Sequence, residues 1–114
     1  MKFSKQNITD IPFVESHGVS QTKQVLLDVA ATESKNWENV TKGILPSGQM
    51  YDWHVHEGID ELFIVTKGNG KFYCEDEATD YKVNDIIMVR AGMKHKIENT
   101  GKETTEGFFI RVKV

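Results

Sequence analysis

The sequence predicts an all-β fold, and three observations carry that prediction. Apolar and polar residues alternate with a period of two through much of the chain from Lys23 to Val114. The alternating segments are short and are separated by turn residues, of which Gly68-Asn69-Gly70 is the clearest example. We find no segment with convincing helical periodicity. Strands at short, regular spacing without helices are typical of an antiparallel sandwich or barrel.

Nine strands are expected in order along the chain. They cover residues 23–29, the surroundings of Val40 and Ile44, and residues 50–56, 61–66, 71–75, 81–83, 86–90, 94–98 and 105–114. An acidic loop is expected over 76–80. Residues 1–22 show the weakest pattern and are expected to form an edge strand, an arm that reaches a second subunit, or a loose tail.

Length and composition indicate one soluble domain over residues 1–114. The chain has 39% hydrophobic and 27% charged residues, which is ordinary for a globular protein. The net charge is −3 without a basic stripe, so nucleic-acid binding has no electrostatic support. The longest apolar run, 86–89, is too short for a membrane span. Cys74 is the only cysteine and is expected to pack as a small core residue; we expect a reduced, cytoplasmic setting.

The residues with the clearest chemistry are histidines. His54 and His56 lie two apart on an expected strand, so their side chains leave the same face, with Cα atoms roughly 6.6 Å apart. Imidazoles at that separation can converge on one metal ion. Glu61 follows after a turn, and His95 lies on a later strand. Spacing alone does not place His95 beside the other three.

The first of these segments resembles a motif of the cupin superfamily. That motif has a glycine, five residues, His-x-His, three or four residues, a glutamate, six residues and a glycine. Here Gly48, His54, His56, Glu61 and Gly68 stand at those positions.

The second cupin motif is matched in its second half. Gly92, His95 and Asn99 are in register, while Asn84 and Arg90 replace the usual glycine and proline. Asparagine tolerates left-handed backbone geometry, so the first change is mild. The two motifs span 48–99. The resemblance implies a double-stranded β-helix, or jelly-roll barrel, in which His54, His56, Glu61 and His95 bind one divalent transition metal.

The donor set leaves the metal open, because three imidazoles and a carboxylate suit Fe, Mn, Ni, Co, Cu or Zn. Around it we expect Met50, Phe63 and Val65 to line the pocket, since they share a face with the ligands. Tyr51 and Trp53 are expected to point away from it, and His17 is expected to be exposed. Asn99 is expected to bond the backbone of a turn.

Three functions follow from the resemblance. The first is a metalloenzyme acting on a small oxygen-chelating metabolite, of oxygenase, lyase or isomerase type. The second is a small-ligand-binding or sensing protein without catalysis, and the third, least favoured, is a structural or storage role. The expected partner is a small acid that chelates the metal. Small cupins resembling this one commonly pair, so a homodimer is expected, with Trp53, Tyr51 and the N-terminal segment as contributors.

Overall fold

The all-β prediction is confirmed. The computed structural model describes residues 2–114 and contains ten strands, with helix limited to two short 3-10 segments, η1 (Ile8–Asp10) and η2 (Val29–Thr32). The strands are β1 (Val14–Ser16), β2 (Val19–Val25), β3 (Trp37–Leu45), β4 (Met50–His54), β5 (Ile59–Lys67), β6 (Gly70–Cys74), β7 (Glu77–Tyr81), β8 (Ile86–Val89), β9 (His95–Glu98) and β10 (Thr105–Lys113). In the described part of the chain, no helix is long and apolar enough to span a membrane.

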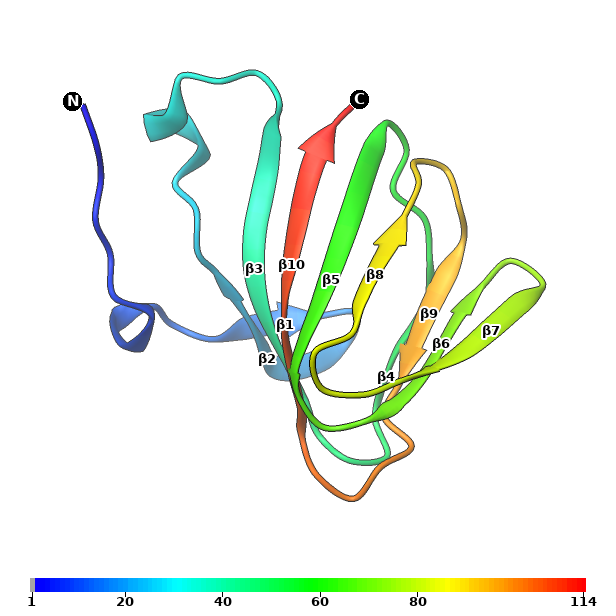
Figure 1. Ribbon diagram of the computed structural model, residues 1–114. Helices are drawn as coiled ribbons and strands as arrows, with labels where there is room; N and C mark the ends of the chain where they lie inside the picture. Colours follow the sequence, from blue (N-terminus) through cyan, green and yellow to red (C-terminus); the bar gives the residue numbers. More distant parts are fainter. Residues whose placement is uncertain (1) are drawn as a thin grey trace.

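The strands form two antiparallel sheets that face each other (Figure 1). The larger sheet has the order β1-β2-β3-β10-β5-β8, and the smaller has the order β4-β9-β6-β7. Neighbours are far apart in sequence, since β10 lies between β3 and β5, and β9 lies between β4 and β6. This arrangement brings the segments around residues 54, 61 and 95 to one region between the sheets.

The core fills the space between the two sheets. Phe63 and Phe109 stack with ring centroids 4.5 Å apart, and Tyr81 packs edge-on against Phe63. Gly43 is required beside them, because a Cβ there would lie 2.7 Å from Cε2 of Phe109. The other large buried residues are Leu45, Tyr51, Val65, Phe72, Val89 and Ile97, with Cys74 packed against them.

Two expected elements differ from the structure. The segment 76–80 is not an acidic loop, because β7 covers Glu77–Tyr81 and pairs with β6. Glu75 adopts a left-handed φ of 53°, which permits a tight turn directly after β6. Charged residues on an exposed edge strand are a usual protection against unwanted pairing. The expected strand at 23–29 instead begins at Val19 and ends at Val25, and with β1 it forms a hairpin at the edge of the larger sheet.

Strand β4 contains an irregularity that reverses one expectation. Tyr51 pairs with Ile97 and His54 pairs with His95, so between these pairs two residues of β4 lie opposite one residue of β9. A bulge of this kind breaks the alternation of faces. Tyr51 therefore lies on the same side as His54, is only 5% exposed and donates its hydroxyl hydrogen to the Thr22 carbonyl at 3.0 Å. The expectation that Tyr51 points outward is wrong.

Candidate metal centre

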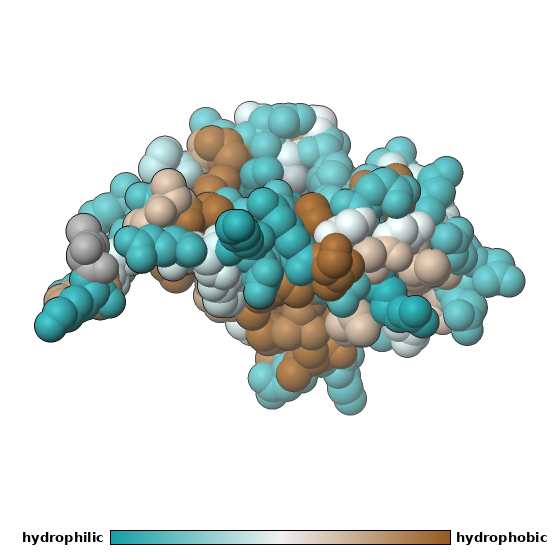
Figure 2. Space-filling model, turned by 90° about the horizontal axis from the view of Figure 1, so that it is seen from above, coloured by the Kyte–Doolittle hydropathy of each residue, from teal (hydrophilic) through white to brown (hydrophobic). Residues whose placement is uncertain are grey.

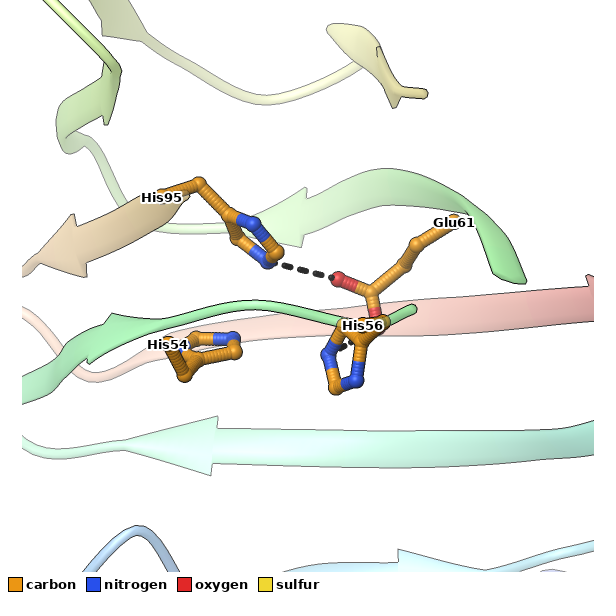
Figure 3. Close-up of side chains that lie close together, drawn as sticks. All are labelled: His54, His56, Glu61 and His95. Atoms are coloured by element: carbon orange, nitrogen blue, oxygen red, sulfur yellow. Dashed lines mark ion pairs between the residues drawn. The ribbon is translucent and has the colours of Figure 1, made fainter. Parts of the chain in front are cut away.

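Four side chains from three strands and one loop converge on a small volume. His54 ends β4, His56 lies in the loop after it, Glu61 is on β5 and His95 begins β9. Each offers one ligand atom, and these atoms all lie within 4.8 Å of one another. Figure 3 shows Glu61 between His56 and His95, with its two oxygens directed at different rings. The structure thus brings together all four residues that the sequence suggested as metal ligands.

Local backbone contacts hold this arrangement. His54 and His95 are directly paired across β4 and β9. A turn at Glu57 and Gly58, where Gly58 has φ 69°, returns the chain into β5. The Gly92 amide donates to the His56 carbonyl at 3.1 Å and ties the two motifs together.

The ring nitrogens are oriented for metal binding. Nδ1 of His54 lies 2.6 Å from the Asp52 carbonyl, and Nδ1 of His95 lies 2.9 Å from the Met93 carbonyl. A carbonyl only accepts, so each Nδ1 carries the proton and each Nε2 keeps its lone pair.

Two of the ring nitrogens are buried without a hydrogen-bond partner. They are Nε2 of His56 and Nε2 of His95, which have no hydrogen-bond partner within residues 2–114. Glu61 oxygens lie 3.6 Å and 3.4 Å from them. Neighbouring ligand atoms around an ion at about 2.1 Å are separated by about 3 Å, so these spacings suit a shared ion. Buried polar atoms are rarely left unpaired, and a divalent metal would satisfy both. The residues therefore fit the group that the sequence suggested.

The protonation states fit the same chemistry. Burial lowers the pKa of His54, more than its bond to Asp52 raises it. Burial also lowers the pKa of His56, against the opposing effect of Glu61. Burial alone would raise the pKa of Glu61, but contact with His95 and the influence of His56 and Arg111 outweigh it and lower that pKa. At neutral pH His54 and His56 are therefore neutral imidazoles and Glu61 is a carboxylate, the forms that bind metal.

Arg111 belongs to the candidate site, and the sequence did not single it out. It is paired with Glu61 across β10 and β5, and its Nη1 lies 3.7 Å from the Glu61 carboxylate. Its Nε donates to Glu38 at 2.6 Å. Arg111 thus neutralises part of the Glu61 charge while being held in place from β3. Arg111 and Glu61 are fifty residues apart in the sequence, so no local pattern indicated that they are in contact.

A pocket opens beside the four side chains. Its empty volume is about 340 Å³, which includes some open solvent. Its lining combines polar residues from the larger sheet and the N-terminal hairpin with apolar residues of the core. The lining residues are Ser16, His17, Lys23, Thr41, Gly43, Tyr51, His54, Glu61, Ile97, Phe109 and Arg111.

His17 belongs to this pocket although the sequence suggested only an exposed residue. It lies in the β1–β2 turn with φ 50°, and its ring stacks on His54 with centroids 4.0 Å apart. One side remains exposed, as expected. Partial burial, followed by the effects of His54 and Lys23, lowers its pKa to about 4. Nothing in the sequence near His17 indicated this contact.

The residues expected to line the pocket lie elsewhere. Val65 is 1% exposed within the core, and Phe63 lines a second, smaller cavity. Met50 pairs with Glu98 and precedes the irregularity in β4, so it does not share the side that Tyr51 and His54 occupy. None of the three is among the lining residues of the pocket.

Comparison with known proteins identifies the family. The family model described as a cupin domain matches residues 42–111, which include all four converging residues. The chain belongs to the cupin family.

Two sequence relatives and two solved structures place this cupin more closely. An oxalate-binding protein from Thermotoga maritima is 34% identical over 62 residues, which is 54% of this chain and 51% of that protein. The uncharacterized protein YdbB from Bacillus subtilis is 40% identical over 47 residues, 40% of this chain and 42% of that protein. The chain thus spans about half or less of the length of either relative.

The structural comparison agrees with a jelly-roll cupin. A crystal structure described as a predicted oxalate decarboxylase from Thermotoga maritima has a TM-score of 0.75 and 27% identity, covering 81% of this chain and 79% of that one. A double-stranded β-helix protein from Klebsiella pneumoniae has a TM-score of 0.75 at 18% identity, covering 98% and 91%, and supports the fold alone.

Proposed function

We propose that this cupin holds one divalent transition metal and uses it to bind a small chelating acid. His54, His56, Glu61 and His95 would hold the ion. The observation that carries the proposal is the pair of buried, unpartnered Nε2 atoms of His56 and His95 on either side of the Glu61 carboxylate. Fe, Mn, Ni, Co, Cu and Zn all suit this donor set.

The ligand would be an acid that offers two oxygen atoms. Four protein ligands leave an octahedral ion two further positions, and an ion in such a site polarises the oxygens that bind it. One coordinating carboxylate leaves a divalent ion with net positive charge, which favours an anion. The oxalate-binding protein from Thermotoga maritima, similar over about half of its length, supports oxalate or a related acid.

Binding is the function that the geometry supports best, and catalysis is the second candidate. Glu61 is the sole carboxylate among the lining residues and belongs to the metal group, so no separate acidic group is placed for proton transfer. His17 supports the alternative, because its imidazole lines the pocket beside the metal group and is placed to exchange a proton with a bound ligand. Turnover would make the protein a metal-dependent oxygenase, lyase or isomerase.

Thermal unfolding tests the binding step. Oxalate should raise the melting temperature of protein loaded with Mn²⁺ or Co²⁺ by mass action, and should not raise that of the apoprotein. His95→Asn, which removes one ligand, should abolish the oxalate effect. Product formation from oxalate would shift the assignment to an enzyme. No shift with oxalate or any other oxygen chelator would contradict the proposal.

We also propose a homodimer, formed through the outer face of the larger sheet. The apolar residues there form two rows across β10, β5 and β8: Ile110, Leu62 and Met88, and Phe108, Ile64 and Ile86. Ile86 is 64% and Met88 55% exposed. Figure 2 shows apolar side chains gathered into one continuous area on the lower side of the view.

A second copy of the chain is the occupant that this face suits. The two rows cross three neighbouring strands and put six apolar side chains on one face, the kind of surface that homodimer interfaces bury. A two-fold axis would pair each row with its own copy. Lys42 and Glu106, which pair at 3.5 Å, lie at the margin of the rows.

We further propose that residues 1–114 form one cupin domain. Its N-terminal part, up to about residue 22, would then serve the site, since the β1–β2 hairpin carries Ser16 and His17 to the pocket.

A further inference from the structure

The pocket has an excess of positive charge. Lys23 and Arg111 line it together with a single carboxylate, Glu61. Arg111 is compensated from outside by Glu38, whose carboxylate lies 2.6 Å from its Nε. Lys23 has no such partner, since no carboxylate within residues 2–114 forms a salt bridge with it. Arg111 and Glu61 thus offset charge within the site, while Lys23 adds a cation that nothing nearby neutralises.

The position of Lys23 directs this charge into the pocket. Lys23 is partly buried on β2 and pairs with Gly43 on β3, and both residues line the pocket. Because Gly43 has no side chain, nothing from this position on β3 fills the space next to the Lys23 side chain. Thr41, two residues before Gly43 on β3, also lines the pocket.

Lys23 is well separated from the metal group. Strands β3 and β10 lie between β2 and β5 in the larger sheet, so Lys23 and Glu61 are three strand spacings apart, about 14 Å measured along the sheet. The side chains of Lys23 and Glu61 both line the pocket, one from each side. One carboxylate bound to the ion cannot also contact Lys23, whereas a second anionic group a few atoms away can.

We propose that Lys23, with the hydroxyl of Thr41 beside it, binds a second carboxylate of the ligand. This inference rests on the proposed metal-dependent binding of an acid and specifies its class. The ligand is a short dicarboxylate longer than oxalate, such as a 2-hydroxy dicarboxylate that chelates the ion at one end. A dianion also balances the charge of the site better than a monoanion. Lys23 precedes the part of the chain that matches the cupin family model, so it would set specificity in this chain.

Two acids that differ by one carboxylate test the proposal. Lactate and malate both offer a carboxylate and an adjacent hydroxyl to a metal, but malate alone has a distal carboxylate. Calorimetric titration of Co²⁺-loaded wild-type protein should give a dissociation constant for malate about tenfold or more below that for lactate. In Lys23→Met that ratio should fall to about twofold or less, because the distal carboxylate loses its cation.

Lys67→Met is the matched control. It removes an equal charge from a half-exposed residue at the far end of β5, six residues beyond Glu61, and should keep the malate preference. Metal content after each titration, measured on desalted protein, verifies that the acids have not removed the ion. Circular dichroism of Lys23→Met verifies that the variant is folded.

The outcomes separate the two proposals. If neither acid nor oxalate binds the loaded protein, metal-dependent acid binding itself fails. If the acids bind but wild-type protein does not prefer malate, or if Lys23→Met keeps the preference, the Lys23 subsite is wrong while acid binding stands. If Lys23→Met does not fold, Lys23→Gln replaces it, and a malate preference retained there contradicts the subsite equally.

Discussion

The imidazole rings of His17 and His54 are stacked with centroids 4.0 Å apart, although one belongs to the N-terminal hairpin and the other to β4. His17 covers one side of a proposed metal ligand without being one of the four converging residues. It therefore shapes the pocket and is not expected to hold the ion.

His17→Asn should consequently retain the metal but bind the small-molecule acid more weakly. Asparagine tolerates the left-handed backbone that His17 adopts, so the turn should survive. We expect metal content close to that of the wild type and a loss of about threefold to tenfold in oxalate affinity, because the pocket wall is opened. His54→Asn is the matched comparison and should lose metal. Equal loss of metal in both variants would show that His17 is a ligand.

The apoprotein should become less stable as the pH falls from about 7 to about 5. Burial holds the pKa values of His17, His54 and His56 below the ordinary value, to about 4 for His17. Unfolded histidines take up protons near pH 6.5, whereas these folded ones do not. The unfolded state thus binds more protons in this range, so stability rises with pH. Glu61 acts in the same direction but mainly below pH 5, because its folded pKa is lowered and an unfolded glutamate takes up its proton near pH 4.5.

Urea denaturation of chelator-treated protein at pH 5.0 and 7.5 measures this effect. The midpoint should be lower at pH 5.0, and His17→Asn should reduce the difference. A midpoint that is equal or higher at pH 5.0 would overturn the assignment of buried neutral histidines. Metal-loaded protein should show the same trend more steeply, because protonation of its ligands also releases the ion.

Gly43→Ala should destabilise the protein by about 1–3 kcal/mol, the usual cost of overpacking a core. The new Cβ would lie 2.7 Å from Phe109 and 3.3 Å from the Tyr51 hydroxyl oxygen. Phe109 is fixed in turn by its stack on Phe63. Lys42→Ala, next to it on the outward side of β3, serves as the control and should cost less. Chemical denaturation of both variants distinguishes them, and equal stability would contradict this packing.

Ile86→Asp should convert the proposed dimer into a monomer. Ile86 is 64% exposed and does not belong to the buried core, so a charge there should leave the fold intact. The same charge should disrupt an apolar face that pairs with its own copy. Light scattering at micromolar concentration should give twice the chain mass for wild type and a single chain mass for the variant. Val83→Asp, also exposed but outside the two rows, should remain dimeric. A monomeric wild type would refute the dimer.

Much of the fold was predictable because it depends on local pattern. Strand alternation and turn residues located most strands, and the expected roles of two asparagines are confirmed. Asn84 has a φ of 76°, and the buried Asn99 side chain donates to the carbonyls of Leu45 and Glu103. Asn84 follows from the backbone preference of asparagine itself, whereas Asn99 was identifiable through its place in the family motif.

The parts that were not predictable depend on pairing between distant strands. The irregularity at β4 exists only relative to β9, so strict alternation placed Tyr51 on the wrong side. Lys23 and Arg111 reach the pocket because β2, β3 and β10 are neighbours in the larger sheet. The sequence around them carries no trace of that neighbourhood. The four converging residues were easier to identify, since both motifs preserve their spacing.

Elemental analysis of protein purified without an affinity tag tests the central claim most directly. At neutral pH, after reconstitution with a divalent transition metal and removal of excess ion, we expect about one metal per chain. His95→Asn and Glu61→Gln should each lower that content sharply, because every one of the four ligands is needed to enclose the ion. Absence of metal from reconstituted wild-type protein, or full retention in both variants, would contradict a metal centre formed by His54, His56, Glu61 and His95.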